Sequence, residues 1–128
     1  MKDLIISRTE CTPKVVFNSN GNLLIEGRSF SEDPMRFFKE ILDWAGSLKS
    51  NEVIFDVILD YLNTSSTKCF YQLIRTIDNN PKIKTLEIRW HYDEDDDEIL
   101  EIGEIYAEDC SKAKFEFRLN REYKPMLF

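Results

Sequence analysis

The topology of this chain depends on residues 51–68, NEVIFDVILDYLNTSSTK, where an apolar strand pattern ends and a helical pattern begins. Apolar side chains alternate along one face of the strand pattern: Val53, Phe55, Val57, Leu59 and Tyr61. The opposite face is also largely apolar, although Asp56 and Asp60 interrupt it. Burial on both faces predicts a central strand in a sheet covered by helices.

Four hydroxyl side chains occupy the junction between the two patterns, at residues 64–67. Beyond them, a helical apolar repeat runs until Pro81 forbids its continuation; its members are Phe70, Leu73, Ile74 and Ile77. We expect one Ser or Thr to cap this helix, which explains one hydroxyl or two. In parallel sheets, functional groups gather where the C-terminus of a strand meets the N-terminus of a helix. The remaining hydroxyls therefore either have a structural role or include an acceptor for a phosphate.

Two short apolar runs, KVVF and NLLIEG, precede this central strand. The Asn20-Gly21 pair between them is typical of a tight hairpin turn. A first helix is expected after Asp33, which suits an N-cap, and Pro34, which suits the first helical position. Its predicted apolar face contains Phe38, Ile41, Leu42, Ala45 and Leu48.

The pattern of the C-terminal third of the chain predicts a strand, a helix and a second strand. TLEIRWHY, residues 85–92, alternates apolar and polar side chains, as does KFEFRLN, residues 114–120. Between them a third helix is expected to turn Ile99, Ile102, Ile105 and Tyr106 inward. The predicted order is β-β-β-α-β-α-β-α-β. This order indicates an α/β fold: a single-domain sandwich with a mixed sheet of about five or six strands and about three helices.

Composition limits the classes of function. The length of 128 residues fits one domain, residues 1–128. A net charge of −7 disfavours nucleic acid and anionic membranes as partners. We find no apolar run long enough to span a bilayer and no secretory signal. Three widely separated cysteines favour small buried thiols in a reducing cytoplasm over a disulfide framework or a zinc site.

The sequence gives little support to catalysis, a cofactor or a metal. It has one histidine, His91, at a strand end opposite Trp90, and no nucleophile motif or glycine-rich phosphate loop. The acidic run DEDDDE, residues 93–98, resembles an EF-hand loop, but Glu98 stands where that loop needs glycine. We therefore expect a solvated N-terminal helix turn there, and a calcium-tuned acidic module remains an alternative.

The junction resembles the signature of a known family. YLNTSS followed by Lys68 is similar to the motif of the SiaC family of bacterial regulatory phosphoproteins. Further matches follow the same order along the chain: Thr12-Pro13, Gly27, Trp44, RWHYD at residues 89–93 and EDC at residues 108–110. The resemblance covers roughly residues 9–118. The tail, residues 119–128, lies outside it, and the acidic run differs from the more basic segment of the family.

The resemblance implies an STAS-like (anti-anti-sigma) fold and a partner-switching function without enzymatic activity. It implies that Thr64 is phosphorylated by a Ser/Thr kinase of the histidine-kinase-like ATPase type and dephosphorylated by a PP2C-type phosphatase. The unmodified protein is then expected to bind and activate a diguanylate cyclase, raising cyclic di-GMP and promoting biofilm formation. The phosphate would release that partner, because a dianion is costly to dehydrate in an interface shaped for a hydroxyl.

The expected partner surface combines the acceptor loop with the strand end near residue 92. Its members besides Thr64 are Tyr61, Leu62, Asn63, Ser65, Ser66, His91 and Tyr92. We expect a cytoplasmic protein that is monomeric when free. The alternative is a constitutive interaction domain in which NTSS only caps a helix.

Overall fold

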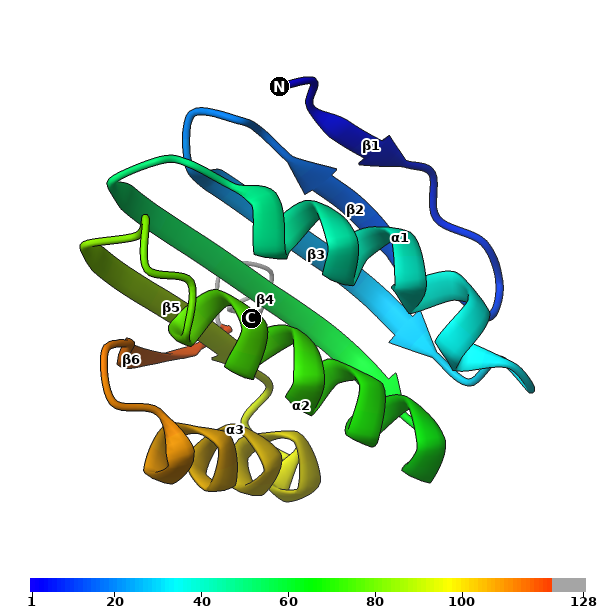
Figure 1. The fold of residues 1–128 in the computed structure, drawn as a ribbon. Coiled ribbons are helices and arrows are strands. Elements are labelled where there is room, and N and C mark those ends of the chain that lie inside the picture. The colour runs from blue at the N-terminus through cyan, green and yellow to red at the C-terminus, as the bar shows by residue number, and fades with distance from the viewer. Residues whose placement is uncertain (121–128) are drawn as a thin grey trace, which may run out of the picture.

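Six strands form one mixed sheet, and three helices pack on it (Figure 1), in a computed structural model that describes residues 1–120. The strands are β1 (Leu4–Ile6), β2 (Lys14–Phe17), β3 (Asn22–Ser29), β4 (Glu52–Leu62), β5 (Thr85–Tyr92) and β6 (Lys114–Leu119). The helices are α1 (Pro34–Ser47), α2 (Thr64–Asp78) and α3 (Asp97–Asp109). This confirms the predicted α/β class and element order.

The strands lie side by side in chain order, β1-β2-β3-β4-β5-β6. The first three are antiparallel, and β3 to β6 run parallel to one another. The hairpin between β2 and β3 forms as predicted. Gly21 donates its N–H to the Asn18 carbonyl at 3.0 Å and has a φ of 104°, a conformation that L side chains rarely adopt.

The start of α1 also follows the prediction. Asp33 is the N-cap, its carboxylate accepts from the Arg36 N–H, and Pro34 is the first helical residue. The end of α1 is held by Asn80, which donates to the carbonyls of Ala45 and Leu48 at 3.0 and 2.9 Å. Of the predicted apolar face, Phe38, Ile41, Ala45 and Leu48 are buried and Leu42 is half-buried.

Aromatic rings fill the core between the helices and the sheet. Phe70 of α2 stands at the centre and contacts the rings of Phe38, Phe55, Trp90 and Tyr106 at centroid distances of 6.1 to 6.3 Å. The Trp90 indole also donates to the Ile99 carbonyl at 2.9 Å. Because these contacts join α1, α2 and α3 to β4 and β5, they fix the position of α2, which begins at the hydroxyl-rich junction.

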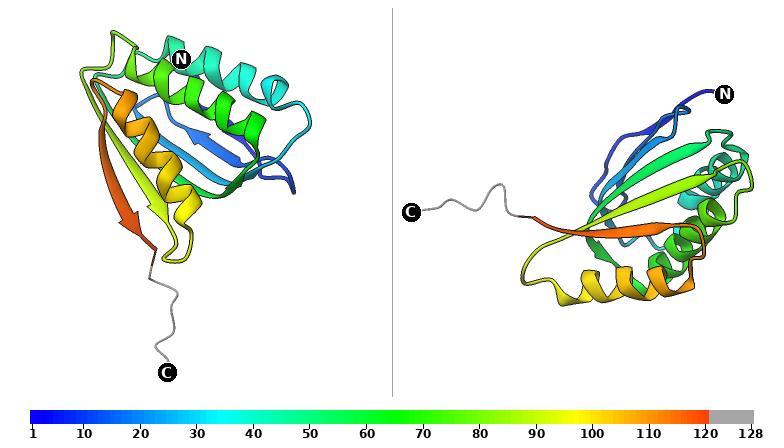
Figure 2. Two further views of the ribbon diagram at one scale, coloured as in Figure 1. Left: turned by 90° about the horizontal axis from the view of Figure 1, so that it is seen from below. Right: turned by 90° about the vertical axis from the view of Figure 1, so that its left-hand side faces the viewer.

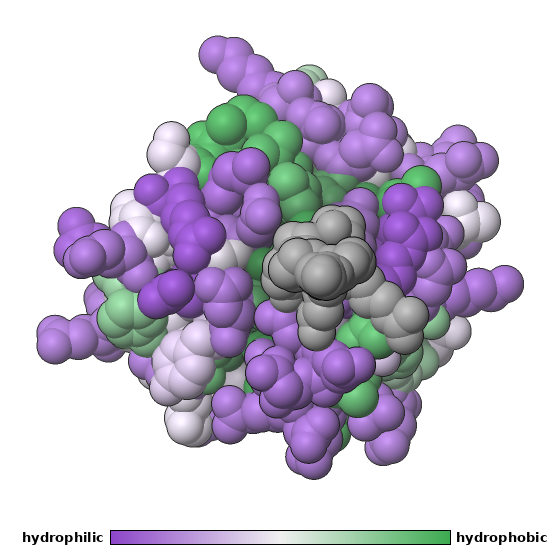
Figure 3. Space-filling model, turned by 180° about the vertical axis from the view of Figure 1, so that it is seen from behind, coloured by the Kyte–Doolittle hydropathy of each residue, from purple (hydrophilic) through white to green (hydrophobic). Residues whose placement is uncertain are grey.

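All three helices lie on one face of the sheet (Figure 2). On the other face Ile54 and Ile58 of β4 are only half-buried, so the prediction that this strand is buried on both faces was wrong. The crossovers from β3 to β6 all step in the same direction, and right-handed crossovers then place every helix on the same side. Within residues 1–120, no helix covers the other face, the open face of the sheet. Figure 3, drawn from that side, shows apolar residues gathered together with hydrophilic residues around them. Within residues 1–120, no helix is long and apolar enough to cross a membrane.

A bulge near the end of β4 changes which side chains face the core. Gly27 pairs with Leu59, but the next residue, Arg28, pairs with Tyr61, so Asp60 is an extra residue in β4. Beyond the bulge, the alternation of β4 side chains between the two faces of the sheet therefore shifts by one residue. Leu62 is buried and Tyr61 is 46% exposed, so the prediction that Tyr61 shares the core face was wrong.

The inward face of α3 also differs from the prediction. Ile99 and Tyr106 are buried and Ile102 is half-buried, as expected, but Ile105 is 58% exposed. Gly103 packs directly against Trp90 instead. A Cβ at this position would lie only 2.5 Å from the indole nitrogen. The helix is thus rotated to bring its glycine against the tryptophan, and Ile105 turns outward.

Candidate functional site

The junction between β4 and α2 lies where parallel strands end, at the C-terminal edge of the sheet (Figure 1). Asn63 is the N-cap of α2: its side-chain oxygen accepts from the Ser66 N–H at 2.9 Å. Its backbone N–H donates to the Ser29 carbonyl at 3.0 Å, and its side-chain amide donates to the Ser31 carbonyl at 3.5 Å. The prediction of a Ser or Thr cap was therefore wrong, because the asparagine one position earlier already performs this role.

Two of the four hydroxyls have structural partners. Ser66 is fully buried, and its hydroxyl lies 2.7 Å from that of Ser29 at the end of β3. Thr67 donates its hydroxyl to the carbonyls of Thr64 and Asn63, at 2.5 and 3.3 Å. Neither hydroxyl is available to a second protein, since one is sealed in the core and the other is bonded to its own helix.

The other two hydroxyls, those of Thr64 and Ser65, are exposed. They belong to the first two residues of α2, and neither hydroxyl bonds to a group in the described part of the chain. The first backbone N–H groups of a helix have no intrahelical acceptor, and the helix dipole favours negative charge there. Lys68, also exposed, lies one turn beyond Thr64 at the i+4 spacing that brings two helical side chains together. The structure thus restricts an acceptor role in this segment to Thr64 and Ser65.

Apolar side chains border this junction. Tyr61 and Phe30 lie edge to face with ring centroids 6.3 Å apart, and they are 46% and 41% exposed. Met35, at the start of α1, is also exposed, and its sulfur contacts the Cys69 thiol of α2 at 3.3 Å. Exposed aromatic residues beside a polar loop are typical of protein interaction surfaces.

The predicted partner surface is only partly assembled. Tyr61, Asn63, Thr64 and Ser65 meet at the junction, whereas Leu62 and Ser66 are buried and cannot contact a partner. The expectation that the whole of residues 61–66 faces outward was therefore wrong at those two positions. The bulge turns Leu62 inward, and the first turn of α2 carries Ser66 under the end of β3.

His91 and Tyr92 are the last two residues of β5. Residues 85–92 are all in β5, so their side chains alternate between the two faces of the sheet. His91 lies on the open face, opposite Trp90, and its ring nitrogen is 2.9 Å from the Asp56 carboxylate. Tyr92 packs against the core on the helical face. A single surface that contains both His91 and the acceptor loop stays a prediction.

The acidic run begins α3. Asp96 is the N-cap, with its carboxylate accepting from the Ile99 N–H at 3.1 Å, and Asp97 and Glu98 are in the first turn. This is the predicted N-terminal turn, where carboxylates are favoured by the helix dipole. Among residues 1–120, no group of three or more His, Cys, Asp or Glu side chains is placed to hold a metal ion.

The thiols of the described chain are not arranged for chemistry. Cys11, Cys69 and Cys110 are all free. Burial raises the pKa of Cys110 to about 11, and burial together with the nearby Asp33 carboxylate raises the pKa of Cys69. Both thiols are therefore protonated at neutral pH, and a protonated thiol is a poor nucleophile.

Sequence reasoning missed two residues of the site, Ser29 and Phe30. Ser29 contacts a residue 37 positions away, and no local pattern marks such a contact. Phe30 follows the end of β3 and meets Tyr61 only because the bulge turns Tyr61 outward. Ser29 ends the neighbouring strand β3 and Phe30 follows it, and the register of β3 with β4 is a property of the fold.

Comparisons with known proteins find one family and several similar proteins and structures. The model of the SiaC family regulatory phosphoprotein matches residues 6–120. A protein of Pseudomonas aeruginosa strain UCBPP-PA14 is 30% identical over 116 residues, which cover 87% of this chain and 92% of that protein. The structure of SiaC of Pseudomonas aeruginosa is similar with a TM-score of 0.81 and 28% identity, covering 94% of this chain and all of the other. A crystal structure of diguanylate cyclase SiaD in complex with its activator SiaC, from the same organism, also matches, with a TM-score of 0.81, 28% identity and coverage of 92% and 100%.

Proposed function

Because the chain belongs to the SiaC family of regulatory phosphoproteins, we propose that it is a non-enzymatic switch protein controlled by phosphorylation of Thr64. A Ser/Thr kinase of the histidine-kinase-like ATPase type adds the phosphate, and a PP2C-type phosphatase removes it. The unmodified form binds and activates a diguanylate cyclase in the cytoplasm. The observation that carries this proposal is the exposed hydroxyl of Thr64 at the first position of α2, which bonds to no group within residues 1–120.

Capping does not account for Thr64. Asn63, the first residue of NTSS, caps α2, as the alternative of a constitutive interaction domain expects, but this cap gives the Thr64 hydroxyl no structural role. The geometry leaves Thr64 and Ser65 as the two accessible hydroxyls, and the likeness of YLNTSS to the family motif favours Thr64. Ser65 is therefore the matched control for every experiment on Thr64.

A phosphate on Thr64 is compatible with the fold. It would lie at the N-terminus of α2, where a negative charge stabilises a helix by about 0.3–1 kcal/mol. It would also lie within one turn of the Lys68 ammonium group. Phosphorylation should therefore leave the protein folded and change only the surface that a partner meets.

The same phosphate is expected to prevent docking. Thr64 follows Tyr61 of the exposed aromatic pair by three residues, so a partner that covers the end of β4 and the start of α2 must dehydrate whatever Thr64 carries. Dehydrating a dianion without new partners costs more than dehydrating a hydroxyl. A loss of about 3–4 kcal/mol would weaken the complex by a factor of about 10² to 10³.

The assignment of a cyclase as the output rests on the relatives. SiaC of Pseudomonas aeruginosa has been crystallised with the diguanylate cyclase SiaD as its activator. We propose no catalytic activity for the chain itself. The histidine, His91, lies on the open face and is paired with Asp56.

Intact-mass analysis tests the proposal directly. The wild-type protein, Thr64→Ala and Ser65→Ala are each incubated with ATP and lysate of the source organism. We expect one added phosphate on the wild type and on Ser65→Ala, and none on Thr64→Ala. Peptide mapping that places the phosphate elsewhere, or phosphorylation of Thr64→Ala, would contradict the proposal.

A further inference from the structure

Strand β6 lies at one edge of the sheet (Figure 2). Within residues 1–120, it pairs with β5 and no strand lies on its other side. The opposite edge is β1, a strand of only three residues, and a very short edge strand offers little to a second chain. Because β6 has six residues, its free edge offers a longer row of backbone groups for pairing.

One hydrogen bond shows which backbone groups of β6 point outward. The Asn120 N–H donates to the Tyr92 carbonyl of β5 at 2.9 Å. In a parallel pair, alternate residues of a strand direct both backbone groups to the same neighbour. The even-numbered residues of β6 therefore bond to β5, and the N–H and C=O groups of Phe115, Phe117 and Leu119 point away from it.

The side chains of β6 divide between the two faces of the sheet. Phe115, Phe117 and Leu119 are half-buried, and the two phenyl rings stack at a centroid distance of 5.9 Å on the helical face. Glu116 and Arg118 are exposed on the open face, where they form an ion pair with each other. Charges of one sign along an edge would repel a second copy, but opposite signs at alternate positions allow it to pair.

The sequence of β6 is complementary to itself in one antiparallel register. When Phe117 of one copy stands opposite Phe117 of the other, Glu116 stands opposite Arg118, and Phe115 stands opposite Leu119. The three outward-facing residues then occupy hydrogen-bonded positions, and the two charged residues occupy the closer non-hydrogen-bonded positions. A slide of two residues either way would place Glu116 opposite Glu116 or Arg118 opposite Arg118, and like charges directly opposite are destabilising.

We propose that two copies of this chain associate through β6, in the antiparallel register centred on Phe117, to form a dimer with one continuous sheet. Addition of a strand to an exposed sheet edge is a recurring mode of recognition. The two-fold symmetry repeats every contact, so the dimer contains the pair of Glu116 and Arg118 twice. A single strand is a small interface, and we therefore expect a weak dimer. This departs from the expectation of a free monomer, which took no account of the edges of the sheet.

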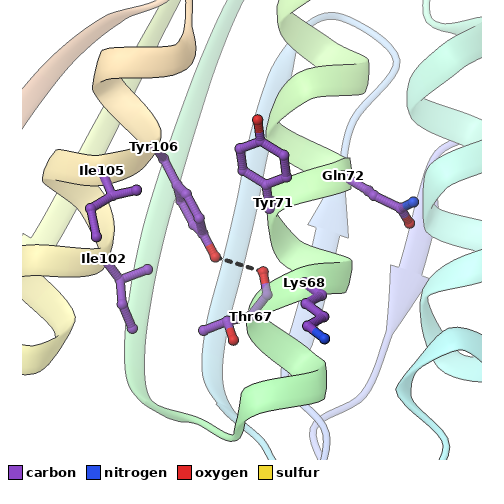
Figure 4. A pocket seen from close by; sticks show the side chains of 7 residues that line it. All are labelled: Thr67, Lys68, Tyr71, Gln72, Ile102, Ile105 and Tyr106. Atoms are coloured by element: carbon purple, nitrogen blue, oxygen red, sulfur yellow. Dashed lines mark hydrogen bonds between the residues drawn. The ribbon is translucent and has the colours of Figure 1, made fainter.

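The proposed interface is separate from the candidate phosphorylation site. Strand β5 lies between β6 and β4, the strand that precedes Thr64. On the helical face, Ile102, Ile105 and Tyr106 of α3 line a pocket together with residues of α2 (Figure 4), and no residue of β6 contributes to it. The dimer therefore leaves the start of both α2 helices accessible. Its failure would leave the proposed function intact, because the tests below need neither ATP nor a partner protein.

Sedimentation velocity of the full chain over a concentration series tests the dimer. We expect the wild type to shift from one chain toward two between about 1 μM and 1 mM, the range in which small interfaces associate. Glu116→Arg and Arg118→Glu each place like charges opposite each other at two positions, so each variant should associate at least about tenfold more weakly. An equimolar mixture of the two variants restores opposite charges at both positions and should dimerise like the wild type.

The matched control is Asp43→Arg, which also reverses one charge of an exposed ion pair, the pair with Lys39 on α1. This variant should associate like the wild type. A wild type that remains a single chain up to about 1 mM would overturn the proposal. Reversal variants that dimerise like the wild type, or a mixture that associates no better than its components, would overturn it as well.

Disulfide formation tests the register without charge reversal. Glu116→Cys mixed with Arg118→Cys should give a disulfide between the two copies, because Cα atoms at non-hydrogen-bonded positions lie about 4.5 Å apart. Either variant alone should form such a bond much more slowly, since its two introduced thiols lie on a diagonal, with about 7–8 Å between residues. Peptide mapping assigns the bond. A mixture that reacts no faster than Glu116→Cys alone would overturn the register.

Discussion

The hydroxyls of Ser29 and Ser66 share a buried hydrogen bond of 2.7 Å that joins the end of β3 to the first turn of α2. Together with the bond from the Asn63 N–H to the Ser29 carbonyl, it fixes the acceptor loop to a neighbouring strand. The exposed Thr64 hydroxyl is therefore presented at the first residue of a helix whose start is hydrogen-bonded to the end of β3.

The first prediction concerns this buried pair. Ser66→Ala should lower the free energy of unfolding by about 1–3 kcal/mol, because it leaves the Ser29 hydroxyl buried without its partner. The double variant Ser29→Ala/Ser66→Ala should lose less than the sum of the two single losses. Urea unfolding measures all three. Strict additivity would show that the two hydroxyls do not interact.

The second prediction concerns the cap. Asn63→Ala should lower the free energy of unfolding by about 1 kcal/mol, since the Ser66 N–H loses its acceptor. Ser65→Ala, two positions along in the same segment, should change it by less than about 0.5 kcal/mol because its side chain is exposed. Thermal unfolding of the two variants side by side checks this. A larger loss in Ser65→Ala would mean that the serine, and not Asn63, caps α2.

The third prediction concerns the contact between α3 and β5. Gly103→Ala should destabilise the protein by about 1–3 kcal/mol, because the new methyl group would overlap the Trp90 ring. Gly46→Ala in α1 is the matched control: its nearest neighbour would be a Thr76 methyl group at 3.7 Å, an ordinary contact. That variant should be neutral or more stable by up to about 1 kcal/mol. Differential scanning calorimetry distinguishes them, and a stabilising Gly103→Ala would contradict the close packing.

The fourth prediction concerns pH. Burial alone would raise the pKa of Asp78, but the backbone N–H groups of Ser111, Ala113 and Lys112 bond its carboxylate and lower the pKa overall. A carboxylate with a lowered pKa in the folded state stabilises the fold above its unfolded pKa, about 3.9, and this contribution disappears as the pH falls through the folded pKa.

Asp78→Asn should therefore cost about 1.5–3 kcal/mol at pH 7, as expected for bonds to a charged group. The difference from the wild type should shrink below about pH 4. Urea unfolding at a series of pH values checks both points, with the exposed Glu104→Gln as control. A difference that stays constant down to pH 2 would rule out the charge of Asp78 as its cause.

Much of the fold could be predicted because its elements repeat at clear periods. The alternation in residues 85–92 and the helical spacing of Phe70, Leu73 and Ile77 each fix an element and its buried face. The Asp33-Pro34 start of α1 and the turn at Gly21 follow from local chemistry in the same way.

The errors occurred where long-range geometry overrides a local period. The bulge at Asp60 depends on the register between β3 and β4, which no single strand reveals, and it reverses Tyr61 and Leu62. The rotation of α3 depends on Gly103 meeting Trp90, so Ile105 faces outward despite its spacing. For the site, the sequence analysis identified the loop and its likeness to the family motif. Only the structure distinguished the exposed hydroxyls of Thr64 and Ser65 from the hydrogen-bonded ones of Ser66 and Thr67.

The most direct measurement compares the affinity of the diguanylate cyclase for unmodified protein with that for protein phosphorylated at Thr64. Thr64→Glu and Ser65→Glu serve as a matched pair in the same titration. The account predicts that the phosphate weakens binding by about 100-fold or more, that Thr64→Glu weakens it in the same direction, and that Thr64→Ala binds like the unmodified wild type. Equal affinity of the phosphorylated and unmodified forms would contradict it.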